Sequence, residues 1–191
     1  MGSVLLFIAA VLLRDEAALR DAFGKEIKAK EAAKRVEAVG KLSGAKEEKT
    51  IDLLVKSLKD PALEVRKAAA KALEGATDGA GKAIQPLGDI LVDKKDDLDL
   101  RLMSAKALSK ARYKSEAFPF FYTTISSIER EERQFHQFGA DVTKILDGYV
   151  GKSFGQDKTT AERWSEWWTD NQKSLKEEDA RKHKEWKEKK E

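Results

Sequence analysis

The chain of 191 residues contains no cysteine. Disulfide bonds, thiolate nucleophiles and cysteine-ligated zinc or iron–sulfur centres are therefore excluded. Proline is also scarce, with three residues in the whole chain, so few positions interrupt a helix. The 37 basic and 34 acidic side chains leave a formal net charge of +3. Because a dedicated polyanion-binding protein usually has a clear basic excess, we expect no specific nucleic-acid partner.

Recognisable catalytic motifs are missing as well. The sequence contains no HExxH, GxSxG or GxGxxG pattern. The stretch GATDGAGK at residues 75–82 has some likeness to a phosphate-binding loop, but Ala76 stands where that loop needs glycine, and Ala83 stands where magnesium needs a hydroxyl. The two histidines, His136 and His183, are too few and too far apart to indicate a metal centre. The sequence predicts no catalytic residue, no metal site and no cofactor.

Long hydrophobic runs are also absent. The longest uncharged apolar run is VLLFIAAVLL, from Val4 to Leu13. Ten residues are too few to cross a bilayer as a helix, so we expect no integral membrane span. The length fits the core of a degenerate export signal or anchor, although the basic leader and a small-x-small cleavage site are missing. Two localisations stay open: the periplasm, if Val4–Leu13 is a signal core, or the cytoplasm, if it is an apolar first helix that caps a helical stack.

What the sequence does contain is a repeated arginine pattern in a chain rich in Lys, Glu, Ala and Leu, which is a helical composition. Arg35, Arg66 and Arg101 are 31 and 35 residues apart. Each is followed by a small residue three positions later and by a leucine seven positions later: Ala38 and Leu42, Ala69 and Leu73, Ser104 and Leu108. A period of this length is typical of stacked helix pairs.

A second pattern of apolar residues supports the first. The segments 49–58, 82–91 and 116–125 align without gaps, and their apolar residues coincide in three sets: Ile51, Ile84 and Phe118; Leu54, Leu87 and Phe121; Leu58, Leu91 and Ile125. Spacings of three and four place each set on one helical face. We therefore predict helix pairs at about residues 27–59, 61–92 and 98–127, with a degenerate fourth pair at about 129–169.

The stretch VRKAAAKAL, preceded by Asp60-Pro61 and followed by a second amphipathic helix, resembles a HEAT-repeat protein of the short bacterial type. The resemblance covers about residues 27–127. It implies an all-α fold, a right-handed α-solenoid of stacked antiparallel helix pairs, as in armadillo-like superhelices. In HEAT arrays the arginines and the turn aspartate tie one repeat to the next. The corresponding signature here is Arg35, Asp60, Pro61, Arg66 and Arg101.

The carboxy-terminal region adds a second likeness. GKSFG (residues 151–155), Asp157 and WSEWW (residues 164–168) are similar to a closing segment of bacterial HEAT-repeat proteins. Trp164, Trp167 and Trp168 lie on one helical face, and we expect them to cap the open end of the last repeat. The alternative is an aromatic platform for a ligand, which the burial of all three indoles would exclude.

These patterns divide the chain into three regions. Residues 1–26 hold the apolar segment and a lead-in helix, and residues 27–169 hold about four helix pairs with the tryptophan-rich cap. Residues 170–191 form a charged helical tail, which has too few apolar residues to bury much surface and is expected to be solvated.

The predicted function is a non-catalytic scaffold or adaptor that binds a protein or peptide through the concave face of the solenoid. The resemblance implies that second helices line this face. Their polar residues carry both signs of charge, which suits a polar protein or peptide ligand. The candidates are Asp52, Lys56, Gln85, Asp89 and Thr123.

Two alternatives follow from the resemblance. Some HEAT-like proteins are DNA glycosylases that trap a lesion with tryptophan, aspartate and arginine, and the tryptophans here stand in the closing segment instead. The third candidate is a HEAT-type bilin lyase or an accessory subunit of an enzyme, although no catalytic residue of that group is matched. The partner's identity and the oligomeric state stay open.

The two interpretations of residues 4–13 predict different native amino termini. If the segment is a cleaved export signal, amino-terminal sequencing of the protein from its natural source will find a start beyond Leu13. Retention of Met1 or Gly2 would contradict export by cleavage.

Overall fold

The computed structural model describes residues 15–76, 81–128, 136–155 and 160–188. This part of the chain is helical, with turns between the helices and no strand. The apolar segment Val4–Leu13 lies outside the described residues, so its two interpretations stay predictions. Within the described ranges, no helix combines the length and apolar character needed to span a membrane. The helices are α2 (Glu16–Glu26), α3 (Ala32–Lys41), α4 (Glu48–Ser57), α5 (Leu63–Glu74), α6 (Gly81–Val92), α7 (Leu98–Leu108), α8 (Lys114–Ile128), α9 (His136–Val150) and α10 (Thr160–Glu188).

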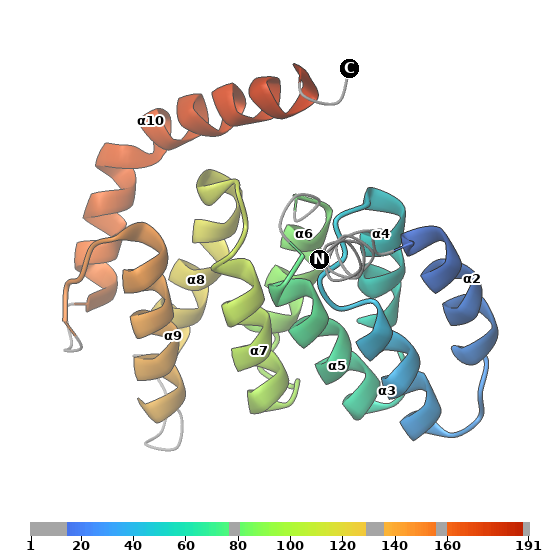
Figure 1. Ribbon diagram of the computed structural model, residues 1–191. Helices are drawn as coiled ribbons and strands as arrows, with labels where there is room; N and C mark the ends of the chain where they lie inside the picture. Colours follow the sequence, from blue (N-terminus) through green and yellow to red (C-terminus); the bar gives the residue numbers. More distant parts are fainter. Residues whose placement is uncertain (1–14, 77–80, 129–135, 156–159, 189–191) are drawn as a thin grey trace, which may run out of the picture.

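The helices form two layers. Helices α3, α5, α7 and α9 pack side by side in the first layer, and α4, α6, α8 and α10 do so in the second (Figure 1). The layers are joined where α4 packs on α5, α6 on α7 and α8 on α9. This stack confirms the predicted all-α solenoid. Its right-handed superhelix stays a prediction.

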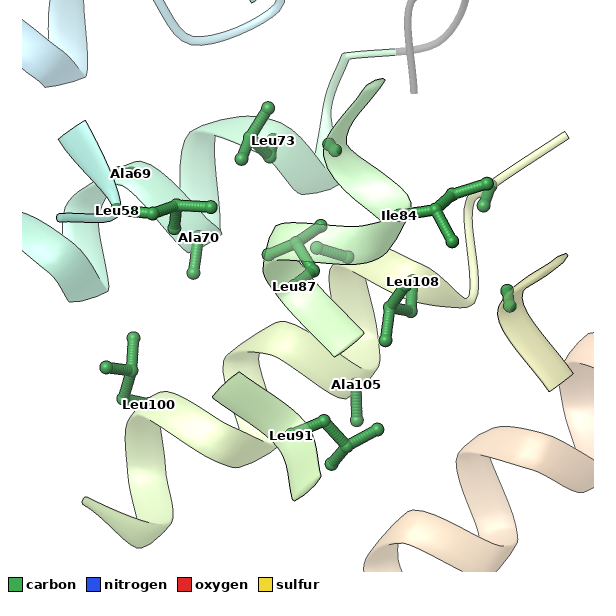
Figure 2. Close-up of a cluster of buried hydrophobic side chains, with 14 of the residues drawn as sticks. Leu58, Ala69, Ala70, Leu73, Ile84, Leu87, Leu91, Leu100, Ala105 and Leu108 are labelled. Carbon is green, nitrogen blue, oxygen red and sulfur yellow. The ribbon is translucent and has the colours of Figure 1, made fainter. Parts of the chain in front are cut away.

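The core lies between the two layers and is built from the residues that repeat in the sequence. Ile51, Leu54, Ile84, Leu87 and Phe121 are each at most 3% exposed. Figure 2 shows leucine, isoleucine and alanine side chains of α5, α6 and α7 gathered in one cluster. Burial of each large aliphatic side chain contributes roughly 1.5–3 kcal/mol. The repeated apolar faces therefore hold each helix to its neighbours along the stack.

Helix α2 occupies a place in the second layer. It packs on α3, and its Glu16 carboxylate accepts hydrogen bonds from the amides of Lys46 and Glu47, just ahead of α4, at 2.7 and 3.1 Å. Arg20 donates to the hydroxyl of Thr50 in α4 at 3.0 Å. The predicted lead-in helix thus stands next to α4 as α4 stands next to α6, in the position of the second helix of a preceding repeat.

Helix α10 contains one exception to the expectation of a solvated tail. It runs without interruption from Thr160 to Glu188, across the predicted boundary between residues 169 and 170. Figure 1 shows its C-terminal half running along one edge of the stack, above α8 and α6. Asp179, in this half, is only 5% exposed. The number of charged residues in the tail does not predict this burial, because one carboxylate can be buried when another helix supplies hydrogen-bond donors.

The close approach of α6 and α8 depends on a glycine. A Cβ atom built on Gly88 of α6 would lie 2.4 Å from the Phe120 ring of α8. Gly88 is buried, and the atoms that it would meet include the first ring carbon, which cannot move aside without moving the side chain as a whole. Gly88 therefore lets the Phe120 ring lie directly on the backbone of α6.

We predict that Gly88→Ala lowers the free energy of unfolding by about 1–3 kcal/mol, because the added methyl group overpacks the contact with Phe120. Urea denaturation will measure the change. Gly24→Ala in α2 is the matched control, since no atom outside its own helical turn lies within 4 Å of the new methyl group among the described residues. The control should be neutral or stabilising by up to about 1 kcal/mol. Equal destabilisation by both variants would contradict the packing explanation.

Candidate functional site

The first part of the site is an ion pair that joins successive repeats. Arg35 of α3 donates from Nε and Nη2 to the carboxylate of Asp60 at 2.9 and 2.8 Å. Its Nη1 donates to the carbonyl oxygens of Ala29 and Lys30, both at 2.9 Å. The Asp60 carboxylate also accepts the amide of Ala62 at 2.8 Å, which fixes the turn before α5. The Arg35 and Asp60 side chains are 12% and 10% exposed, so the pair is largely shielded from water.

The same arrangement continues one repeat further along the stack. Arg66 donates from Nη1 to the backbone oxygen of Asp60 at 3.2 Å and from Nη2 to the Asp96 carboxylate at 3.2 Å. Asp60 therefore binds the preceding arginine through its carboxylate and the following arginine through its carbonyl. Pro61 is exposed, and its carbonyl oxygen lies 3.4 Å from Arg66 Nη1.

Arg101 is the most buried arginine of the series, with 1% exposure. Its Nε donates to the Leu91 carbonyl oxygen at 3.0 Å, and its guanidinium lies 4.5 Å from the centre of the Phe138 ring. This contact is a cation–π interaction with α9. Arg101 thus binds α6 on one side and α9 on the other.

The ion pair shifts the titration of its members. Hydrogen bonds from Arg35, which outweigh the opposing effect of burial, hold the pKa of Asp60 below its usual 3.8. The hydrogen bond to Asp60 likewise raises the pKa of Arg35. Both groups therefore stay ionised over a wider pH range in the folded chain.

Sequence reasoning missed Asp96 as the second turn aspartate. Asp60 stands six residues before Arg66, whereas Asp96 stands five residues before Arg101. A gapless alignment of the arginines places Lys95 opposite Asp60, so the equivalence is hidden. An alignment that allowed one deletion in the turn could have found it.

The tryptophans of the closing segment pack on α8. Trp164 is fully buried, its ring centre 4.7 Å from that of Phe154 and 5.8 Å from that of Phe118. Trp168 stacks on Phe118 with ring centres 4.6 Å apart, and Trp167 lies 5.4 Å from the same ring. Trp167 and Trp168 are half-buried. The three indoles cover α8, as a cap would, but they are not all buried. Asp157 lies outside the described residues.

The predicted concave-face residues lie on three successive helices of the second layer. Lys56, Gln85, Asp89 and Thr123 are exposed, and Asp52 is half-buried. Asp52 and Glu48 of α4 both pair with Lys82 of α6, at 3.2 and 3.0 Å, and Gln85 donates to Asp89 at 2.7 Å. The pairs formed by Lys82 raise its pKa, because the two carboxylates favour the charged ammonium group.

A groove of about 650 Å³ lies at the edge of the second layer where α4, α6 and α8 begin. It opens between the C-terminal half of α10 and the first residues of α4, α6 and α8. Its lining carries both signs of charge and three aromatic or imidazole rings: Glu48, Lys82, Tyr113, Glu116, His183 and Trp186. In the ranges that the structure covers, no cluster of three histidine or carboxylate side chains is arranged to hold a metal ion. No local pattern predicts this groove, because its lining residues are far apart in the chain.

Residues 20–109 match the family model described as HEAT repeats. The matched region begins in α2 and ends just after α7, and it contains the whole series from Arg35 to Arg101. A search of curated proteins finds no match to the chain.

We predict that Asp60→Asn lowers the melting temperature by about 3–10 °C, because a neutral amide replaces the acceptor of three hydrogen bonds and two arginines lose a nearby negative charge. Glu37→Gln, an exposed carboxylate on the same layer, is the matched control and should change little.

The effect of Asp60→Asn should also depend on pH. Since the pKa of Asp60 is lower in the folded than in the unfolded chain, its stabilisation is present above the usual value of 3.8 and is lost as the pH falls through the lower folded value. The melting temperatures of the wild-type protein and of Asp60→Asn, measured from pH 7 down to pH 2, should therefore begin to converge below about pH 4. A constant difference down to pH 2 would contradict the assigned role of the carboxylate.

Proposed function

The chain is a HEAT-repeat protein, and from this premise we propose that it is a non-catalytic scaffold or adaptor that binds a protein or peptide partner. The proposed contact surface is the exposed face of α4, α6 and α8, which we take to be the concave face of the solenoid. The observation that supports it is a row of exposed polar residues at repeating positions, led by Lys56, Gln85 and Asp89. Stacked repeats commonly use such extended surfaces for recognition.

The electrostatics of this face support binding over proton transfer. A general base works best when its pKa lies close to the working pH, as a lysine does when its pKa is lowered. Lys82 has the opposite shift, since Glu48 and Asp52 raise its pKa and keep it charged. The adjacent surface carries an acid, a base and an amide, a mixture that selects a partner by complementary polar contacts.

The positions of the tryptophans do not favour the nucleic-acid alternative. A base or lesion can stack only on an accessible ring. Trp164 is fully buried between Phe118 and Phe154, and Trp168 already stacks on Phe118. The indoles are therefore used within the fold.

We predict that the triple variant Lys56→Ala, Gln85→Ala, Asp89→Ala captures its partners at least tenfold less well than the wild-type protein. Thr123→Arg, which adds bulk at the same face, should have a similar effect. All four positions are exposed, so the fold should be kept. The measurement is quantitative mass spectrometry of proteins captured from the natural source by each immobilised variant.

The matched control removes an acid, a base and an amide from the first layer: Glu37→Ala, Lys106→Ala and Gln137→Ala, all exposed. This control should retain the captured proteins. Equal losses of captured proteins in both triple variants, or no loss in either, would contradict the assignment of partner binding to the exposed face of α4, α6 and α8. Retention of nucleic acid alone, with a steep dependence on salt, would favour the nucleic-acid alternative.

A further inference from the structure

The C-terminal half of α10 packs across the N-terminal ends of helices in the second layer. We call residues 175–188 the strap. Figure 1 shows this part of α10 running along one edge of the stack. Its inward residues are Leu175, Asp179, His183 and Trp186, whose spacings of four, four and three place them on one helical face. Three of them line the groove described above: Asp179, His183 and Trp186.

The main anchor of the strap is a carboxylate bound to the start of another helix. Asp179 accepts the amide of Lys114 on Oδ1 at 3.2 Å and the amide of Ser115 on Oδ2 at 2.7 Å. These are the first two residues of α8, whose amides have no partner within their own helix. A carboxylate also interacts favourably with the dipole at a helix N-terminus. One turn further along, His183 Nδ1 lies 3.0 Å from the hydroxyl of Tyr113.

A second carboxylate is bound in the same way at the same end of the second layer. Glu16 accepts the amides of Lys46 and Glu47, just ahead of α4. Burial tends to raise the pKa of Glu16, but hydrogen bonds from Thr50 and from these two amides outweigh it and lower the pKa. Carboxylates supplied by other helices are thus a recurrent feature of this end of the second layer.

The strap buries few of its own side chains. Among its fourteen residues Asp179 alone is buried. The groove of about 650 Å³ remains between the strap and the starts of α4 and α6, so the strap covers this surface without filling it. Segments with few buried contacts open at a much lower cost in free energy than the core of the fold.

We propose that the N-terminal ends of α4, α6 and α8 form a docking site for a helix, which the strap occupies within the chain. The partner that takes its place is a helix of another protein with the same inward face: a carboxylate, then an imidazole or aromatic ring four residues later and an aromatic ring seven residues later. The carboxylate binds the amides of Lys114 and Ser115, and the rings fill the space beside Tyr113. This surface adjoins the one in the proposed function at Glu48 and Lys82, and the strap limits access to it.

The chain's own strap is the probe that tests the site. A fluorescently labelled synthetic peptide of residues 170–191 is titrated with three full-length proteins: wild type, Asp179→Asn, and Glu177→Gln as the control, since Glu177 is exposed on the same helix. Because the intact strap competes for the site, apparent affinity falls with the fraction of open molecules. We expect Asp179→Asn protein to bind the peptide at least tenfold more tightly than the other two proteins. A peptide that itself carries Asp179→Asn should lose this binding.

Two further measurements keep the outcome decisive. Hydrogen exchange should increase in residues 175–188 of Asp179→Asn protein and stay unchanged in α5 and α7. If this variant does not fold, the double variant His183→Ala, Trp186→Ala loosens the strap without touching the cap of α8, and the same gain in peptide affinity is expected. Equal peptide binding by all variants, or none, would overturn the docking site. A dimer that the peptide dissociates would make a second copy of the chain the occupant, and would overturn the proposed partner. Neither peptide binding nor its absence depends on Lys56, Gln85 or Asp89, the residues that test the proposed function, because none of them lines the groove.

Discussion

The stack depends on a largely shielded ion pair, between Arg35 and Asp60, whose charged groups are hydrogen-bonded. A shielded arginine or carboxylate is costly unless its donors or acceptors are all used. Arg35 uses Nε, Nη1 and Nη2, and Asp60 uses both its carboxylate and its carbonyl. Because the carboxylate binds the arginine of one repeat and the carbonyl binds that of the next, the turn between them is held in one position. The turn thereby adds directional hydrogen bonds to the non-directional packing of the apolar faces, and so constrains the register of neighbouring helices.

The parts of the structure that repeat in the sequence could be predicted, and those that occur once could not. The rows of Ile51 and Leu54 and their equivalents define helix faces by spacing alone, so the layers and the core follow from periodicity. Asp96 was hidden by a turn shorter by one residue. The placement of α2 beside α4 and the burial of Asp179 depend on partners about 30 and 65 residues away. No local pattern specifies such contacts, since an acidic residue on a charged helix has the same appearance whether it faces water or the amides of another helix.

The change in one repeated position explains how the stack ends. Ile51 and Ile84 are buried aliphatic residues, and the equivalent residue in α8 is Phe118. Its ring contacts Trp164, Trp167 and Trp168 of α10. An aromatic ring here gives the indoles a flat surface to stack on, and such contacts add to the free energy of simple area burial. Helix α10 is therefore bound through Phe118, an aromatic residue at a repeated position that is aliphatic in α4 and α6.

The alternation of helix direction has a consequence for the edges of the stack. Successive helices of the second layer point the same way, as the gathering of Glu48, Gly81 and Ser115 around one groove indicates. Their N-terminal amides and partial positive charges are then collected at one edge, where each helix can bind a carboxylate. Glu16 and Asp179 use this property at two places. Since the arginine and aspartate contacts lie in the turns at the opposite ends of these helices, a carboxylate can leave this edge while the register of the stack is kept. A solenoid built in this way can therefore exchange a helix at its edge without loss of its core.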